Sequence, residues 1–176
     1  MAVKINQRTP LFNGRVFRLL RENVTLDNGV TTDLDYIEHP GAAAIVPMIT
    51  AHEVLLIKQY RHALKRYIWE IPAGTLDPQE EVSACARREL EEETGYSAGE
   101  WHKLGEITPV PGYSDERIHL FLAFQLRPTH QELDPDEVLD VHRVLLAQAV
   151  EMIAGGDIQD AKSICGLLMA QKWFLT

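Results

Sequence analysis

Residues 74–96 read GTLDPQEEVSACARRELEEETGY, with several glutamates near the end of the segment. The segment has the length of a helix, and at about 100° per residue Glu89 and Glu93 fall on the same side as Val82. Glu92 also lies nearer to this apolar side than to the opposite one. A solvated run of charges would occupy the other face, so the sequence predicts carboxylates that point toward the protein interior.

The predicted helix covers residues 78–94 and has a signal at each end. Asp77 is a suitable N-cap, and Pro78 is well tolerated in a first turn. Glu80 has the capping-box spacing from Asp77, and Gly95 suits the left-handed residue that ends many helices. Both boundaries of the helix are therefore well marked.

Short runs rich in branched residues predict strands around this helix. The turn signal at 27–29 separates strand-like segments at 14–26 and 30–39, which favours an N-terminal hairpin. After the break at 40–41, we expect AAAIVPMI, EVLLIKQY and IWEIP to be strands of one sheet. Further strands are predicted at 101–108, 117–125 and 139–145, followed by helices at 146–154 and 161–173.

The composition indicates an acidic globular chain, and an acidic protein needs cations wherever it binds an anion such as phosphate. It has 176 residues, a formal net charge of −9, 45% hydrophobic residues and 24% charged residues. These values suit one compact domain or a domain with a small appendage, and they argue against nucleic acid or an anionic membrane as the main partner. Two cysteines, no apolar signal core and no run of about 18 apolar residues predict a cytoplasmic protein.

Inward carboxylates on a helix have three explanations at this level. Buried arginines pair with them, metal ions bind them, or the helix packs less closely than its apolar stripe suggests. Arg87 and Arg88 are adjacent and can supply pairing, but each uncompensated buried acid costs about several kcal/mol. Because hard ions such as Mg²⁺ join protein carboxylates to substrate phosphates, the sequence favours metal binding over a purely structural network.

The segment resembles the Nudix box, G-x5-E-x7-R-E-U-x-E-E-x-G-U, in which U is a bulky apolar residue. The matching positions are Gly74, Glu80, Arg88, Glu89, Leu90, Glu92, Glu93 and Gly95, with Tyr96 at the last, usually aliphatic, position. The resemblance implies an α/β fold, the Nudix α/β/α sandwich with a mixed sheet. It also implies that Glu89 and Glu93 are the main metal ligands, with Glu92 assisting. Arg88 would orient these acids.

The segment before the box, QYRHALKRYIWEIPAG, resembles that of the ADP-ribose pyrophosphatase subgroup. The similarity implies that the Ala73 carbonyl completes a metal site and that Arg61 and Glu70 contact substrate. Pro111 matches the subgroup's marker for ADP-ribose. The N-terminal hairpin resembles the subgroup's dimerisation arm, so we expect residues 1–40 to form an antiparallel β arm exchanged between two subunits, and residues 41–176 to form the Nudix domain.

The implied chemistry is metal-dependent attack of water on a pyrophosphate. Mg²⁺ ions, or Mn²⁺ in their place, would neutralise the phosphates and lower the pKa of a bound water. The subgroup takes its catalytic base from an acidic loop ahead of the last strand, here residues 134–137. Glu137 is the first candidate for the base and Glu116 the second, and Pro135 stands where many relatives carry another glutamate.

Several of these residues also suit simple structural roles. Glu80 suits a helix cap, Glu70 suits an ion pair with a basic neighbour, and Arg61 suits an ordinary solvated loop. Pro111 suits a turn. The acidic run at 132–140 likewise suits a solvated loop.

The expected function is hydrolysis of ADP-ribose to AMP and ribose 5-phosphate by a Mg²⁺-dependent homodimer. A pyrophosphatase for GDP-mannose or another nucleoside diphosphate sugar is the alternative within the same class. A non-catalytic sensor of ADP-ribose-like ligands is the alternative from a different class. Known sensors usually have eroded box acids and an added DNA-binding domain, whereas all the box acids are present here.

Overall fold

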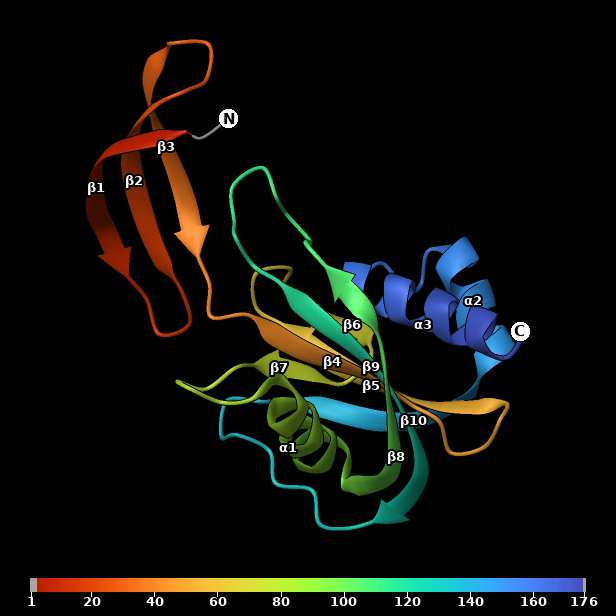
Figure 1. Ribbon diagram of the computed structural model, residues 1–176. Coiled ribbons are helices and arrows are strands. Elements are labelled where there is room, and N and C mark those ends of the chain that lie inside the picture. The colour runs from red at the N-terminus through yellow and green to blue at the C-terminus, as the bar shows by residue number, and fades with distance from the viewer. Residues whose placement is uncertain (1–2, 176) are drawn as a thin grey trace.

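The computed structural model describes residues 3–175 and shows an N-terminal β arm that projects from an α/β body (Figure 1). The arm is one antiparallel sheet in the order β1-β2-β3. Its strands are β1 (Lys4–Asn13), β2 (Arg18–Thr25) and β3 (Thr31–Glu38). The predicted hairpin is β2-β3, closed by a turn in which Gly29 has a φ of 83°. Strand β1 was not predicted, because its residues are all exposed and carry no apolar alternation.

The body contains a four-stranded mixed sheet in the order β7-β4-β9-β8. Its strands are β7 (Ala73–Thr75), β4 (Ala42–Pro47), β9 (Ile118–Pro128) and β8 (Tyr96–Ile107). Strands β4 and β9 are parallel, and the other pairs are antiparallel. Strand β4 is buried on both faces, because Ala43 and Ile45 pack with one helical layer while Ala44 and Val46 pack with the other. This arrangement confirms the predicted mixed sheet between helices.

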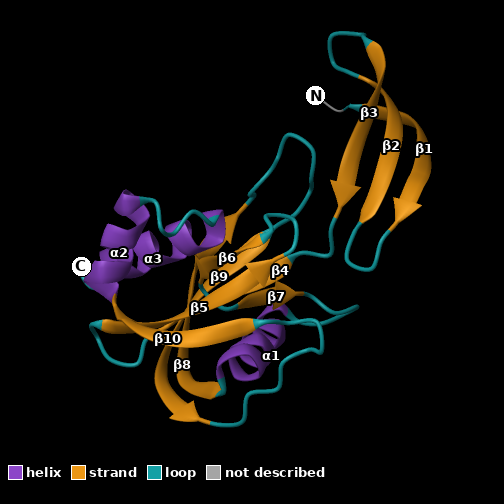
Figure 2. Ribbon diagram, turned by 180° about the vertical axis from the view of Figure 1, so that it is seen from behind, coloured by secondary structure: helices purple, strands orange, loops and turns teal. Residues whose placement is uncertain are grey.

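A second sheet, in the order β10-β5-β6, lies beside the first (Figure 2). Its antiparallel strands are β10 (Leu139–Leu145), β5 (Glu53–Arg61) and β6 (Arg66–Glu70). The expectation that β4, β5 and β6 share one sheet was therefore wrong. The chain turns at 50–53, and a single bridge between Met48 and Val54 joins the two sheets there. Side-chain periodicity identifies a strand but does not identify its partner.

Three helices cover the sheets, α1 (Val82–Thr94) on one side and α2 (Leu146–Gly155) with α3 (Ala161–Trp173) on the other (Figure 1). Gly95 ends α1 with a φ of 70°, as predicted. Asp160 caps α3 by accepting a hydrogen bond from the Ser163 N–H. Within residues 3–175, none of the helices has the length and apolar character needed to cross a membrane.

Helix α1 begins later than the sequence predicted, at Val82 instead of Pro78. Gln79 has a φ of 67°, which is incompatible with a right-handed helix. Asp77 and Glu80 instead close a turn, in which the Asp77 N–H donates to Glu80 Oε2 over 3.0 Å. The capping-box contact therefore exists, but it stabilises the loop that precedes the helix.

Candidate active site

The buried face of α1 carries carboxylates. Glu89 and Glu93 are 7% and 1% exposed, and they lie on the face that also buries Leu90. The Glu92 side chain is 40% exposed and stands at the edge of this face. The predicted inward direction is confirmed for Glu89 and Glu93, whereas Glu92 points to the boundary with solvent.

Arg88 binds three of the box acids at once. Its Nη1 donates to Glu89 Oε1 over 2.6 Å and to Glu92 Oε2 over 3.0 Å. Its Nε and Nη2 donate to the two oxygens of Glu80, each over 2.9 Å. These hydrogen bonds lower the pKa of Glu80 to about 2. Pairing by arginine therefore accounts for Glu80, Glu89 and Glu92, but among residues 3–175 no cation lies within hydrogen-bond distance of Glu93.

Strand β7 lies directly on the acids. The Ala73 N–H donates to Glu93 Oε2 over 2.8 Å. A Cβ added to Gly74 would lie only 1.8 Å from Glu89 Oε1, so the box glycine is needed for the carboxylate to occupy this position. Glu89 and Glu93 are thus held from two sides, by α1 and by the backbone of β7.

The charges of these acids are poorly compensated. Burial raises the pKa of Glu89 to about 7, against the opposing effect of Arg88. Burial and then the charge of Glu89 raise the pKa of Glu93 well above its usual range. A hard divalent cation would relieve both effects, and carboxylate oxygens are the ligands it prefers. Across residues 3–175 no three acidic, histidine or cysteine side chains converge on one point, so a bound ion would take further ligands from backbone carbonyls, water or substrate.

Residues 38–166 match the family model of the NUDIX domain. This chain belongs to the Nudix family. The match spans both sheets of the body, α1 and α2, and it ends within α3. Nudix hydrolases generally use divalent metal ions, which agrees with the donor set described above.

Alignments with similar proteins extend over almost the whole chain. An ADP-ribose pyrophosphatase of Bacillus subtilis is 39% identical over 155 residues, covering 87% of this chain and 84% of that protein. The methanol dehydrogenase activator of Bacillus methanolicus is 36% identical over 163 residues, covering 92% and 88%. A solved structure of an ADP compounds hydrolase is 26% identical and superposes with a TM-score of 0.86, covering 99% and 95%. These similarities extend beyond the Nudix domain into the arm.

A pocket of about 340 Å³ opens beside the acids of the Nudix box. Its polar or backbone walls come from Arg61, Glu70, Ala73, Gly74, Thr75, Glu116, Asp160 and Lys162. Arg61 donates from Nε and Nη2 to the two oxygens of Glu70, over 2.6 and 2.7 Å. The expected ion pair of Glu70 with a basic neighbour is therefore present. Burial opposes ionisation of Glu70, but Arg61 and Lys162 outweigh burial and lower its pKa.

Of the residues predicted to contact substrate or to act as the base, Pro111 and Glu137 do not line this pocket. Pro111 is exposed in the loop between β8 and β9, and Pro109 of the same loop lines the pocket instead. Glu137 lies on the loop before β10, where its Oε2 accepts from the Asp134 N–H over 3.1 Å. Its charge helps to raise the pKa of both Glu89 and Glu93, so its carboxylate lies near these two acids. The structure thus brings Arg61, Glu70 and Glu116 together in one pocket, while Glu137 lies on a separate loop near the acids of α1.

Lys162 is a residue of this site that the sequence analysis missed. Its side chain is 9% exposed, and its ammonium contacts Glu70 and, over 3.1 Å, Asp160. The available signal was helical spacing, because Lys162 precedes Gly166 by one turn on the buried face of α3. A lysine on such a face indicates a buried acid opposite it.

We expect Glu93→Gln to stabilise the metal-free protein by roughly 1–3 kcal/mol at pH 8 and to abolish its stabilisation by Mg²⁺. The pKa of Glu93 is raised in the folded state, so folding retains a proton that the unfolded chain has already lost. Wild-type stability should therefore fall as pH rises above the usual glutamate range, and Glu89 acts in the same direction between 4.5 and about 7. Thermal unfolding at pH 5 and pH 8, with and without Mg²⁺, measures both effects.

Glu91→Gln is the matched control, because Glu91 lies on the exposed face of the same helix. This variant should keep the wild-type pH dependence and the shift with Mg²⁺. A Glu93→Gln protein that Mg²⁺ stabilises as strongly as wild type would contradict the interpretation.

Proposed function

We propose that this Nudix enzyme hydrolyses ADP-ribose to AMP and ribose 5-phosphate, with Mg²⁺ as its metal. The observation that carries the proposal is the position of two buried acids, both with raised pKa values, next to a pocket that Arg61 lines. Acids of this kind attract divalent ions, while the guanidinium of Arg61 suits the remaining charge of a diphosphate. The similarity to ADP-ribose pyrophosphatase supports the choice of substrate.

In this proposal Glu89, Glu93, Glu92 and the Ala73 carbonyl hold more than one metal ion between them, since no three acidic side chains of residues 3–175 converge on one point. When bound, Mg²⁺ neutralises the diphosphate and lowers the pKa of a bound water. Arg88 keeps the Glu89 and Glu92 carboxylates in fixed orientations through its paired hydrogen bonds. The ordering of these groups before substrate arrives lowers the cost of reaching the transition state.

Glu137 is the proposed general base and Glu116 the second candidate. Glu137 lies on a loop near the acids of α1, from which a carboxylate can approach the attacking water and accept its proton. Glu116 lines the pocket, and the distance from its Oε1 to His39 Nδ1 is 3.8 Å. Pro111 remains a proposed marker of ADP-ribose specificity, acting through the loop that it shares with Glu116.

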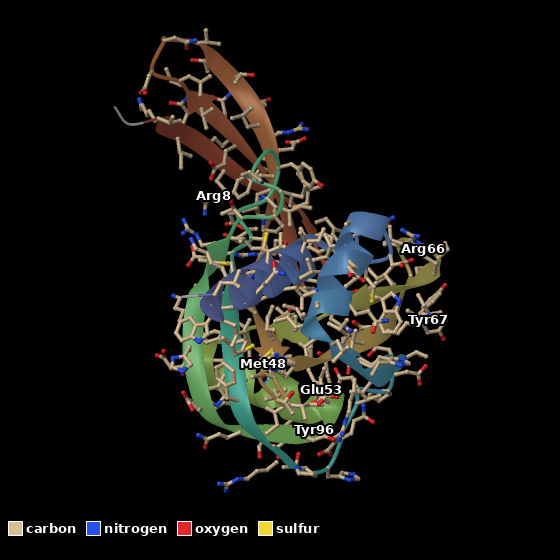
Figure 3. The ribbon with its side chains drawn as sticks, turned by 90° about the vertical axis from the view of Figure 1, so that its right-hand side faces the viewer. Arg8, Met48, Glu53, Arg66, Tyr67 and Tyr96 are labelled. Carbon is tan, nitrogen blue, oxygen red and sulfur yellow. The ribbon has the colours of Figure 1, made fainter. Side chains whose placement is uncertain are left out.

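We also propose a cytoplasmic location and a homodimer formed through an arm at residues 1–40. Cys85 and Cys165 are both free thiols, as expected in a reducing compartment. The arm projects beyond the body (Figure 3), and all residues of β1 are exposed. The exposed apolar residues of the arm are Val3, Ile5, Leu11, Phe12, Val16, Phe17, Val30 and Leu34. Large apolar side chains gathered on one projecting element favour contact with a second subunit.

Incubation of the protein with Mg²⁺ and separate samples of ADP-ribose, GDP-mannose and NADH, followed by identification of products, tests the function. We expect AMP and ribose 5-phosphate from ADP-ribose, at the highest kcat/KM of the panel. Preference for GDP-mannose would support the alternative pyrophosphatase instead. Binding of ADP-ribose without turnover of any of these compounds would support a sensor.

Glu137→Gln is expected to lower kcat by about 10²- to 10⁴-fold with little change in KM, because a general base acts in the chemical step. Single-turnover assays with ADP-ribose measure this loss. Glu132→Gln removes an acid from the same loop and should stay within about threefold of wild type. If Glu137→Gln loses less than tenfold while Glu116→Gln loses more, the base is Glu116.

Sedimentation velocity at micromolar concentration tests the dimer. We expect wild type to sediment as a dimer and the double substitution Leu11→Ser with Phe12→Ser to shift it toward monomer, because the two side chains are 44% and 57% exposed in one chain. Leu168→Ser, which alters a 43% exposed leucine on α3, is the control and should remain dimeric. A monomeric wild type would refute the arm-mediated dimer.

A further inference from the structure

The first turn of α3 is hydrogen-bonded to the segment between β6 and the Nudix box. Asp160 Oδ2 accepts hydrogen bonds from the N–H and the Oγ of Ser163, over 2.9 and 2.6 Å. Ser163 Oγ in turn accepts from the Ile71 N–H over 2.8 Å. Ile71 directly follows Glu70, so the turn that caps α3 also fixes the backbone next to the pocket.

Lys162 adds a charged contact to this attachment. Its ammonium lies against Glu70 Oε2 and 3.1 Å from Asp160 Oδ2. Glu70 is 1% exposed, and a carboxylate so deeply buried needs both cations around it. Arg61 Nε donates to Oε1, while Arg61 Nη2 and Lys162 share Oε2. The oxygens of Glu70 are thus occupied by protein donors.

The occupied carboxylate determines how Arg61 faces the pocket. One edge of the guanidinium, Nε with Nη2, is bound to Glu70, which leaves Nη1 on the opposite edge. The Arg61 side chain is 40% exposed and lines the pocket. An arginine held along one edge presents the other as a fixed fork for phosphate or hydroxyl oxygens.

We propose that Lys162 is a positioning residue for substrate binding, which holds Glu70 so that Arg61 presents its free edge to the diphosphate sugar. This inference rests on the proposed hydrolysis of ADP-ribose. Lys162 acts through Glu70 and not on the reacting phosphorus, so its effect belongs to binding. Lys162 belongs to α3, so a helix far from the Nudix box in the sequence contributes to substrate binding.

The first test is Lys162→Met, which keeps most of the aliphatic stem and removes the charge. We expect KM for ADP-ribose to rise about tenfold, with kcat within about threefold of wild type. Lys162→Arg should recover part of the loss, because it restores a cation near Glu70. Lys172→Met, on the exposed last turn of the same helix, should leave both constants unchanged.

A double-mutant cycle separates positioning from a general structural effect. Arg61→Gln alone should raise KM. Adding Lys162→Met to this variant should raise KM little further, because the Arg61 guanidinium that Lys162 positions is already absent. Fully multiplicative losses, or an unchanged KM in Lys162→Met, would overturn the proposal. If the methionine variant does not fold, Lys162→Gln replaces it in the cycle with the same expectation.

Calorimetric titration of ADP-ribose in the presence of Ca²⁺ distinguishes this inference from the proposed function. If wild type binds ADP-ribose but turns over none with Mg²⁺, the proposed function fails. The double-mutant cycle of Lys162 and Arg61 is then measured on the Kd for ADP-ribose in place of KM. If wild type does not bind ADP-ribose at all, the positioning role is overturned as well.

Discussion

The burial of Glu89 and Glu93 on the inner face of α1 determines how the elements around them pack. Arg88 is shared among Glu80, Glu89 and Glu92, so Glu93 has its hydrogen bond from the backbone of Ala73. This contact requires β7 to lie against α1, and the approach leaves no room for a side chain at Gly74. Buried acids with raised pKa values lower the free energy of unfolding. Such acids are found mainly at functional sites, where a bound cation stabilises their charges.

Local information in the sequence was sufficient for much of α1. The helical period of 3.6 residues predicted that Glu89 and Glu93 point inward, and Gly95 predicted where the helix ends. Its start was misplaced because Glu80, which suits a helix cap locally, is held by Arg88 from the following turns. A similar limit applied to the strands β4, β5 and β6. Their composition predicted each strand, but partners are chosen by tertiary packing that a local period does not record.

Three residues of the pocket were expected from the resemblance of one continuous segment to the ADP-ribose pyrophosphatase subgroup. Arg61, Glu70 and Ala73 follow one another along β5, β6 and β7, so a single stretch of sequence places them together. Lys162 comes from 92 positions beyond Glu70, and only its place on a buried helical face indicated a role. Pro111 shows the opposite case, because a residue matched by motif lies in an exposed turn while Pro109 forms the wall.

The arm contacts the loops of both candidate bases, but with unequal strength. Arg15 pairs with Asp136 on the loop of Glu137 over 2.8 Å, with side chains 77% and 59% exposed, and such surface pairs contribute about 0–1 kcal/mol. The loop of Glu116 is joined to β3 by backbone hydrogen bonds from Ile37 to Tyr113 and from Asp115 to Ile37, over 2.8 and 3.1 Å. Asp115 Oδ1 also accepts from the His39 N–H over 2.8 Å. A displacement of the arm would therefore move the wall that carries Glu116 and leave the loop of Glu137 largely independent.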